Sequence, residues 1–445
     1  MVLVKAKFPA DFIWGTATAS YQIEGAVFAD GRGESIWDRF CRMPGRVLNG
    51  DRGDTACDHY HRYAEDVAIM RELGVNSYRF SIAWPRVFPT GKGKANPKGL
   101  DFYKRLLDEL EAAGIRPMAT LYHWDLPQAL QEECGGWVSR DVAFYFRDYA
   151  AYVFEQIGDR LGWVVTINEP WVAAMLGYGF GTHAPGIRDF KAALQAGHYL
   201  LYGHGLTVQV FREIGLPGQV GLALNLTPYY PHRDAPEDLA VARRMDGITN
   251  RWYLDAVLRG QYPEDVAEWY AERKVLPDLP REDLTVISQP IDFLGINYYT
   301  RGIVGHSDED PCGLKEYPPE GPVTDMNWEV YPQGLYDLLT RITRDYGSIP
   351  LYITENGAAF PDQVEDGRVR DTARTAYLEA HFHQAAEALA KEVPLRGYFV
   401  WSLLDNFEWA FGYSKRFGIV YVDYQSQERI IKGSGLWYRD FIRNG

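Results

Sequence analysis

The sequence has little cysteine, no long apolar run and no signal-peptide pattern. Its four cysteines (Cys41, Cys57, Cys134 and Cys312) form no CxxC pair, so we expect free thiols in a reducing compartment rather than a disulfide scaffold or a metal site. No apolar run approaches the roughly 20 residues that a membrane-spanning helix needs. Residues 1–8 lack the apolar core and cleavage site of a secretory signal. We therefore expect a cytoplasmic protein with no membrane partner.

A block of basic residues and a phosphate-binding loop are also missing. The chain has 46 Lys and Arg against 60 Asp and Glu, a net charge of −14, which disfavours nucleic-acid partners. There is no Walker sequence. The glycine-rich stretch 177–181 follows a helical pattern and lacks the spacing of a dinucleotide-binding loop. These absences point away from nucleic-acid binding and nucleotide chemistry.

Short apolar runs alternate along the whole chain with longer amphipathic segments. The predicted strands are Phe12–Ala17, Ser77–Ile82, Pro117–Tyr122, Val164–Ile167, Val220–Leu224, Asp292–Ile296, Leu351–Thr354 and Gly397–Trp401. The predicted helices are Tyr60–Leu73, Leu100–Ala113, Arg140–Ile157, Phe190–Ile214, Pro332–Tyr346 and Thr372–Ala390. We expect long loops at Glu34–Asp54 and Thr300–Met326, which are rich in Gly, Pro and charge.

Eight strands separated by helices predict an α/β fold, a (β/α)8 TIM barrel with parallel strands. An open doubly wound sheet is the alternative, which strand periodicity by itself does not exclude. No linker separates two cores and no repeat is visible. We therefore expect a single catalytic domain over residues 1–445.

Two stretches, 166–170 (TINEP) and 353–357 (ITENG), each place a glutamate where an apolar strand ends. These glutamates are Glu169 and Glu355. Two carboxylates facing each other across a pocket are the minimum equipment for glycoside hydrolysis. Polar and aromatic side chains occur at the same end of most other predicted strands: Gln22, Arg79, His123, Trp124, Asn168, Asn225, Asn297, Tyr299 and Trp401. A barrel would gather all of them on one rim, where barrel active sites lie.

These motifs resemble glycoside hydrolase family 1, the retaining β-glucosidases. The resemblance runs from residues 12–25 (FIWGTATASYQIEG) to Trp437-Tyr438, and the three motifs are specific to the family. Two positions depart from its pattern: Ile167 replaces the usual Phe, and Gly433 stands where an acidic residue is common. Neither touches a reacting group, so the expected activity is unaffected.

The resemblance implies Glu355 as nucleophile and Glu169 as general acid, then general base. Arg79 and Tyr299 match the partners of the nucleophile, and a cation plus a hydroxyl donor favour the ionised carboxylate. The charge on Glu355 and desolvation should both raise the pKa of Glu169. We expect the two carboxyl groups to lie roughly 5 Å apart, the retaining geometry.

The resemblance also implies the substrate-binding residues. The expected hydrogen-bonding partners of the terminal sugar (the glycone) are Gln22, His123, Asn168, Asn297 and Glu408. The expected aromatic contacts are Trp124, Trp401, Trp409 and Phe417, with Trp328 lining the site of the leaving group (the aglycone). Glu408 and Phe417 argue against a 6-phosphosugar, whereas the single Lys415 is a weak signal for one. His123 and Arg79 could instead be structural, and the role of His183 stays open.

The sequence thus predicts a retaining exo-β-glycosidase that acts on unphosphorylated β-glucosides and also on β-galactosides and β-fucosides. Its expected partners are small β-glycosides or short oligosaccharides, as in cellulose degradation. The mechanism needs no metal and no organic cofactor. The alternatives are a transglycosylase and a sugar-binding barrel that has lost its chemistry. The sequence does not predict the oligomeric state.

Overall fold

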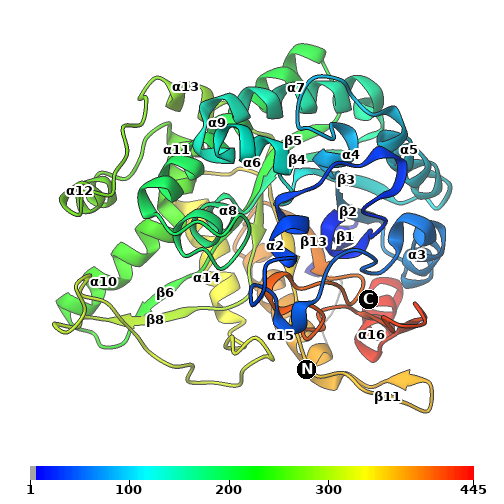
Figure 1. Cartoon of the computed structure of the whole chain (residues 1–445). Coiled ribbons are helices and arrows are strands. Elements are labelled where there is room, and N and C mark those ends of the chain that lie inside the picture. Colours follow the sequence, from blue (N-terminus) through cyan, green and yellow to red (C-terminus); the bar gives the residue numbers. More distant parts are fainter. Residues whose placement is uncertain (1–6, 445) are drawn as a thin grey trace.

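The computed structural model describes residues 7–444, and its centre is a closed barrel of eight parallel strands (Figure 1). Residues 1–6, part of the stretch on which the expected lack of a signal peptide rests, lie outside the described residues. The barrel strands are β1 (Ile13–Ala17), β2 (Ser77–Ser81), β3 (Arg116–Tyr122), β4 (Trp163–Asn168), β5 (Gln219–Asn225), β7 (Phe293–Asn297), β10 (Leu351–Asn356) and β13 (Leu395–Trp401). Each overlaps one predicted strand, so the predicted (β/α)8 barrel is confirmed.

The barrel closes where its first strand pairs with its last. β1 and β13 run parallel in register, from Ile13 opposite Gly397 to Ala17 opposite Trp401. On its other edge β1 pairs with β2, and the order continues through neighbours in the chain. All residues of β1, β2, β4, β7 and β10 are buried, as expected for strands covered on both faces.

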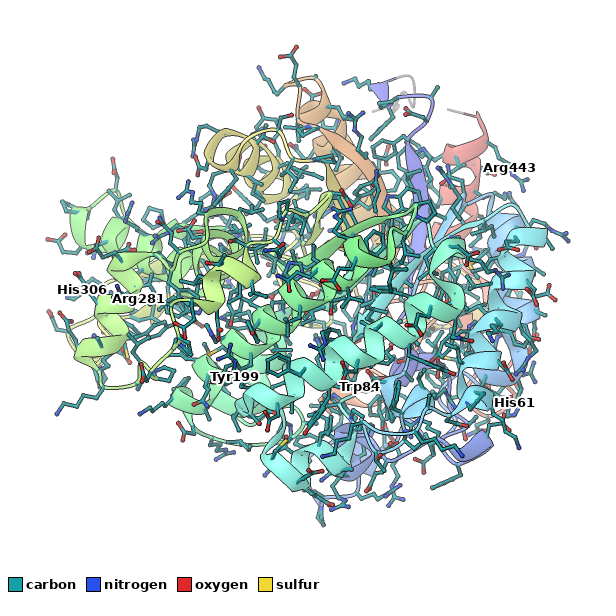
Figure 2. All side chains as sticks on the ribbon, turned by 90° about the horizontal axis from the view of Figure 1, so that it is seen from above. His61, Trp84, Tyr199, Arg281, His306 and Arg443 are labelled. Carbon is teal, nitrogen blue, oxygen red and sulfur yellow. The ribbon has the colours of Figure 1, made fainter. Side chains whose placement is uncertain are left out.

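Long helices cover the outside of the barrel. They are α3 (His59–Leu73), α5 (Pro97–Ala112), α7 (Arg140–Ile157), α9 (Phe190–Ile214), α14 (Gln333–Tyr346), α15 (Thr372–Leu389) and α16 (Gly433–Asn444). The first six overlap the six predicted helices. Figure 2, seen from above, shows Trp84 among these elements, whereas His61 and Arg443 point outward at the edge. The helical layer therefore buries one face of every strand.

Several shorter elements were not predicted from the sequence. Between β5 and β7 the helical layer is divided into α10 (Pro236–Asp246), α11 (Trp252–Arg259), α12 (Glu264–Glu272) and α13 (Asp283–Ile287). The short helices at the strand ends are α1 (Ser20–Ile23), α4 (Trp84–Val87), α6 (Gln128–Cys134) and α8 (Pro170–Ala174). Small antiparallel pairs form from β11 (Val364–Glu365) with β12 (Arg368–Val369) and from β14 (Val420–Val422) with β15 (Arg429–Ile431). Helices of one or two turns carry too little periodicity to be predicted from sequence.

The two stretches expected to be long loops contain regular structure. Within Glu34–Asp54, helix α2 (Ile36–Cys41) begins with a capping box, in which Ser35 and Asp38 each accept a hydrogen bond from the other's backbone N–H. Within Thr300–Met326, β8 (Gly302–Gly305) pairs with β6 (Tyr229–Pro231) and β9 (Lys315–Glu316). The loop prediction was therefore wrong for part of each stretch. In the first stretch, Ser35 and Asp38 form the Ser-x-x-Asp pattern of a capping box, which is a local sequence signal for the start of α2.

Side chains fill the barrel interior up to its C-terminal end. Trp163 and Tyr352 contact each other near the N-terminal ends of their strands, through a 3.1 Å hydrogen bond from the indole N–H to the phenol oxygen. Trp401 and Phe417 belong to the same apolar cluster, at the opposite end. The interior is thus a packed core beneath a rim, which is where a barrel can hold a site. Among residues 7–444, no helix is both long and apolar enough to cross a membrane.

Candidate active site

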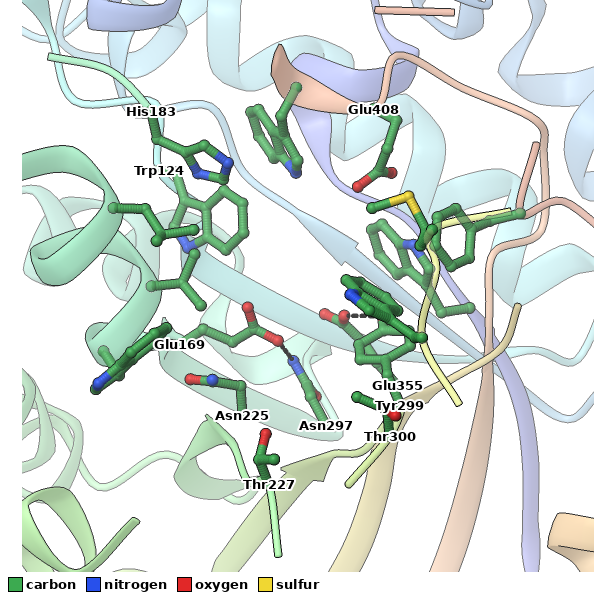
Figure 3. Close-up of a pocket in the computed structure, with 18 of the residues that line it drawn as sticks. Trp124, Glu169, His183, Asn225, Thr227, Asn297, Tyr299, Thr300, Glu355 and Glu408 are labelled. Atoms are coloured by element: carbon green, nitrogen blue, oxygen red, sulfur yellow. Dashed lines mark hydrogen bonds between the residues drawn. The ribbon is translucent and has the colours of Figure 1, made fainter. Parts of the chain in front are cut away.

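A cavity of about 290 Å³ opens at the C-terminal ends of the barrel strands. Of the predicted residues, those that line it are His123, Trp124, Glu169, Asn297, Tyr299, Trp328, Glu355, Trp401, Glu408, Trp409 and Phe417. Figure 3 shows Glu169 and Glu355 facing each other across this cavity, with Glu408 on a third side. Arg79, Gln22 and Asn168 do not line the cavity and lie in the layer behind it.

Glu169 is the first residue after β4, and it adopts a left-handed backbone conformation with φ 50° and ψ 65°. Such a conformation is uncommon for a residue with a side chain and is concentrated at functional sites. Pro170 follows and begins helix α8, so the strand turns sharply into a helix at Glu169. Glu169 is 5% exposed, and its side chain accepts a 2.7 Å hydrogen bond from Asn297 Nδ2 (Figure 3).

Glu355 is the fifth of the six residues of β10 and is held by two donors. Arg79 Nη1 donates to Oε1 at 2.7 Å, and the Tyr299 hydroxyl donates to Oε2 at 2.6 Å. Arg79 was expected at the end of β2 but is the third of its five residues. Its long side chain reaches Glu355 from inside the barrel, and both are almost fully buried.

The amides of Asn168 and Asn297 join the two carboxyl groups into one network. Asn168 Oδ1 accepts from Arg79 Nη2 at 2.6 Å and from Asn297 Nδ2 at 3.0 Å. Asn168 Nδ2 lies 3.1 Å from His123 Nε2, which leaves the ring proton of a neutral His123 on Nδ1. His123 Nδ1 itself is buried and has no hydrogen-bond partner within residues 7–444.

Gln22, in helix α1, is fully buried beside Glu408. Its Nε2 donates to Asn406 Oδ1 at 3.0 Å and lies 3.4 Å from Glu408 Oε2. Gln22 Oε1 is buried without a partner among the described residues, as is Asn225 Oδ1 in the cavity wall. Buried polar atoms are almost always hydrogen-bonded in native proteins. Together with His123 Nδ1, these atoms indicate a ligand rich in hydroxyl groups.

Aromatic rings form most of the cavity wall. The imidazole of His123 lies nearly parallel to the rings of Trp401 (centroids 5.8 Å apart) and Trp409 (6.1 Å). Trp124 contacts Trp409 with ring centroids 4.6 Å apart. Trp328 lies between Tyr299 (5.3 Å) and Phe417 (6.2 Å). Flat apolar faces beside polar atoms suit a sugar ring, which has both kinds of surface.

The structure also brings residues into the cavity that were not predicted as binding residues. They are Trp171, Val172, Leu176, Leu226, Thr227, Thr300, Met326 and Phe411, together with His183 and Asn225. Trp171 and Val172 lie in α8, directly after Glu169. The available signal was that both residues directly follow the TINEP motif (166–170) in the sequence. The sequence did not show which face of α8 they occupy.

Burial and mutual repulsion shift the acid–base behaviour of the carboxyl groups. Burial, reinforced by the charge of Glu355, raises the pKa of Glu169 to about 8. Burial also raises the pKa of Glu408 to about 8. Burial raises the pKa of Glu355 as well, although Arg79 and the Tyr299 hydroxyl act to lower it. Arg79 and Tyr299 thus act on the pKa of Glu355 in the expected direction. The opposing effect of burial was not predicted, because no local sequence pattern records how deeply Glu355 is buried.

Burial and the nearby charge of Arg79 lower the pKa of His123 well below its usual value. His123 is therefore neutral, and Arg79 is the cation that contacts the carboxyl group of Glu355.

Comparison with known proteins agrees with this geometry. A sequence profile of Glycosyl hydrolase family 1 matches residues 4–445. The chain is 50% identical over 447 residues to Beta-glucosidase A of Acetivibrio thermocellus, with 99% of each chain covered. It is 45% identical to the Bifunctional beta-D-glucosidase/beta-D-fucosidase of Bifidobacterium breve, with 98% of each covered.

Solved structures show the same fold. The beta-glucosidase from Thermotoga maritima in complex with glucoimidazole superposes with a TM-score of 0.96 at 49% identity, covering 99% of each chain. The chain matches these proteins over almost its whole length, with about half of its residues identical and with the same fold. The chain belongs to glycosyl hydrolase family 1.

Proposed function

We propose that this protein is a retaining β-glucosidase, with Glu355 as nucleophile and Glu169 as general acid and then general base. The observation that carries the proposal is the unequal surroundings of two carboxyl groups in one cavity. Glu355 accepts from a cation and a hydroxyl, whereas Glu169 accepts from a neutral amide. Environments that separate two carboxyl groups in this way assign one to ionised and the other to protonated chemistry.

In the first step, a carboxylate oxygen of Glu355 forms a bond to the anomeric carbon while the bond to the leaving oxygen breaks. Glu169 gives its proton to that oxygen, so the aglycone departs as a neutral alcohol. In the second step, Glu169 takes a proton from water, the water oxygen bonds to the anomeric carbon, and Glu355 leaves. Two inversions at one carbon retain the β configuration.

The terminal sugar is held by hydrogen bonds from the layer behind the cavity wall. Gln22 Oε1 and His123 Nδ1 supply an acceptor and a donor that have no protein partner. We propose that the glycone hydroxyls bind these two atoms, Glu408 and the amides of Asn168 and Asn297. Trp124, Trp401, Trp409 and Phe417 would then contact the apolar faces of the sugar.

The preferred glycones are unphosphorylated β-glucosyl, β-galactosyl and β-fucosyl groups. Glu408 supports the lack of a phosphate, because a buried carboxyl group that already lies in the field of Glu355 offers no positive charge to balance a second anion. The bifunctional relative from Bifidobacterium breve supports activity on fucosides. A cavity whose wall includes Trp409 and Glu408, with the buried Gln22 behind Glu408, favours attack at a chain terminus, the exo mode.

The leaving group would rest against the outer, mainly apolar wall formed by Trp328, Trp171, Val172, Leu176 and Met326. Such a wall accepts many aglycones, including the next glucose of a short cellulose fragment. We therefore propose a role late in cellulose degradation. A cytoplasmic location agrees with Cys41 and Cys57, which are buried free thiols.

We further propose that residues 1–445 act as one catalytic domain. The barrel cannot close without both β1 and β13, which lie near opposite ends of the chain. The residues proposed for catalysis and binding come from strands and loops all around the barrel.

The test is a proton NMR time course with an aryl β-glucoside, recording which glucose anomer appears first. Release of β-glucose first is expected, and release of α-glucose first would contradict Glu355 as nucleophile. The Glu355→Gln variant should lose about 10³-fold or more in kcat. Asp283→Asn is the matched control, because Asp283 is a buried carboxylate held by Arg140 and His198, away from the cavity.

A further inference from the structure

Six charged side chains form a buried ion cluster beside the active site. They are Arg374, Arg416, Lys432, Asp362, Asp371 and Asp405, three cations and three anions. The side chains of Lys432 and Asp405 are 0% exposed, and that of Arg416 is 19% exposed. None of these six, all within the described residues, lines the cavity. The catalytic mechanism therefore does not account for them.

Asp405 joins the two ends of the loop that forms one wall of the cavity. We call residues 405–418 the wall loop, since it carries Glu408, Trp409 and Phe417. The carboxylate of Asp405 accepts from Arg416 Nη1 at 2.6 Å and from the backbone N–H of Gly418 at 3.0 Å. Both contacts return the far end of the wall loop to its first residue.

Lys432 fixes this closed loop to the body of the barrel. Its Nζ donates to Asp405 Oδ1 at 2.6 Å and also to Asp362. Its backbone N–H donates to the carbonyl of Ile419, which follows the wall loop. Lys432 directly precedes α16, which packs against α15 near the chain's C-terminus (Figure 1).

Arg374 connects the wall loop to the strand that carries the proposed nucleophile. Its Nη2 donates to the carbonyl oxygen of Arg416 at 2.7 Å, and its Nε donates to that of Ala358 at 3.1 Å. Ala358 lies three residues after Glu355. Arg374 also pairs with Asp362 and Asp371. The cluster therefore sets the position of the wall loop relative to the end of β10.

Buried ion pairs contribute little net stability, because desolvation offsets their attraction. They do, however, oppose any shift of one partner, since movement leaves a buried charge without its counter-charge. Burial and the charge of Arg374 lower the pKa of Lys432, while Asp405 and Asp362 act to raise it. A cluster of this kind resists displacement of the wall loop more than it adds to stability.

We propose that Asp405, Arg416 and Lys432 are positioning residues that determine which glycone the enzyme prefers. They do so by holding Glu408, Trp409 and Phe417 at fixed places against the sugar. This inference rests on the proposed function, in which these three residues contact the glycone. Galactose differs from glucose in the orientation of one hydroxyl group, and fucose is galactose without its 6-hydroxyl group, so a small shift of the wall loop changes their relative binding.

The test compares Asp405→Asn with wild type on the 4-nitrophenyl β-glucoside, β-galactoside and β-fucoside. Loss of one charge releases Arg416 and Lys432 without a change of volume. We expect the ratios of kcat/KM among the three sugars to change by about tenfold, because small misplacements carry large kinetic effects. The change should appear mainly in KM, since Glu355 and Glu169 stay in place.

Asp283→Asn is the matched control for the loss of a buried carboxylate. Both variants should melt at lower temperature, but Asp283→Asn should keep the wild-type sugar ratios. If Asp405→Asn keeps those ratios within about twofold, or slows all three sugars by one common factor through kcat, the proposal is overturned.

If Asp405→Asn does not fold, two variants at Arg416 test the proposal. Arg416→Lys keeps a cation for Asp405 and should retain the wild-type ratios, whereas Arg416→Met should change them. Equal ratios in both Arg416 variants would contradict the proposal. Failure of the proposed function is recognised separately, by an active Glu355→Gln variant or by α-glucose as first product of the wild type.

Discussion

Glu355 depends on partners that come from distant parts of the chain. Arg79 and Tyr299 are 276 and 56 residues away in sequence, yet each contacts one carboxylate oxygen. A carboxyl group this deeply buried would stay protonated in an apolar site, since burial disfavours its charge. The guanidinium and the hydroxyl counter that effect, which favours the ionised form that the proposed mechanism needs.

Removing the Tyr299 hydroxyl should therefore weaken the nucleophile. Tyr299→Phe loses a hydrogen bond to a charged group, with a value of about 1.5–3 kcal/mol, or roughly 10- to 100-fold in kcat. Loss of the donor raises the pKa of Glu355 further. In a plot of kcat against pH, the rise on the acidic side should therefore move to higher pH; we call this rise the acidic limb, and the fall at high pH the basic limb.

Tyr298→Phe is the matched control for this change. Tyr298 is the preceding residue and is fully buried, but its hydroxyl donates to the carbonyl of Tyr331 instead. The control should melt at lower temperature with an unshifted acidic limb. An equal shift of that limb in both variants would argue against a direct effect on Glu355.

The pKa of Glu169 sets the basic limb of the same profile. In the proposed mechanism Glu169 must be protonated to release the aglycone, and burial beside Glu355 raises its pKa to about 8. Cleavage of an alkyl β-glucoside should therefore persist through neutral pH and fall as pH rises through about 8. Glu169→Gln should abolish that limb and should slow alkyl glucosides far more than dinitrophenyl glucosides, whose leaving group needs no proton. The measurement is the initial rate of aglycone release for both substrate types between pH 5 and pH 10, and similar slowing of both would contradict the acid role.

At the scale of elements, the catalytic rim is built from abrupt turns after the strands. Trp124, Glu169 and Trp409 all line the cavity and all have positive φ, at 79°, 50° and 49°. Each such conformation costs on the order of 1–3 kcal/mol and persists only where the surroundings enforce it. The rim thus holds three strained residues around the cavity.

Helix α2 supports one of these strained residues through its packing. It carries Trp37, whose ring lies 4.6 Å from that of Trp409. The capping box at Ser35 begins this helix. Ser35→Ala should cost about 1 kcal/mol of unfolding free energy, measured as a lower urea midpoint. The loss leaves a buried backbone N–H without its acceptor.

Ser139→Ala provides the comparison, because Ser139 caps α7 through one longer hydrogen bond, 3.3 Å to the N–H of Asp141, at an exposed site. It should lower the urea midpoint less than Ser35→Ala does. Equal midpoints for the two variants would show that the buried Ser35 hydroxyl contributes no more to stability than the exposed hydroxyl of Ser139.

For the whole molecule, closure of the barrel forces three carboxyl groups into one cavity. Glu169 and Glu408 both have pKa values raised to about 8 by burial, well above the ordinary value of 4.5. The unfolded chain loses these protons near pH 4.5 and the folded chain near pH 8. Stability from these two groups is therefore complete below about pH 4.5 and declines as pH rises to about 8.

Replacing both carboxyl groups should remove this dependence. In thermal melts, the Glu169→Gln/Glu408→Gln variant should gain over wild type as pH rises from 5 to 9. Glu387→Gln serves as control, because Glu387 is a surface residue paired with Lys7, which lowers its pKa. A gap between variant and wild type that stays constant with pH would contradict the assignment.

The sequence by itself determined the strands and the two glutamates, because both signals are local. A strand covered on both faces needs an apolar run, as in residues 163–165 and 351–353, and the glutamate of the rim lies at the C-terminal end of each strand or directly after it. The family motifs identified Gln22, Glu408 and Trp409 for the same reason, since each lies in a specific short stretch.

Only the tertiary structure decided what depends on contacts between distant segments. It placed Asn168 behind the cavity wall, brought Trp171 and Phe411 into the wall, and assembled the ion cluster around Asp405. It also set the pKa of Glu355, since burial at the centre of a closed barrel is a property of all eight strands together. No local pattern records how far a carboxyl group lies from water or which cation reaches it, because those quantities arise only once the chain has closed on itself.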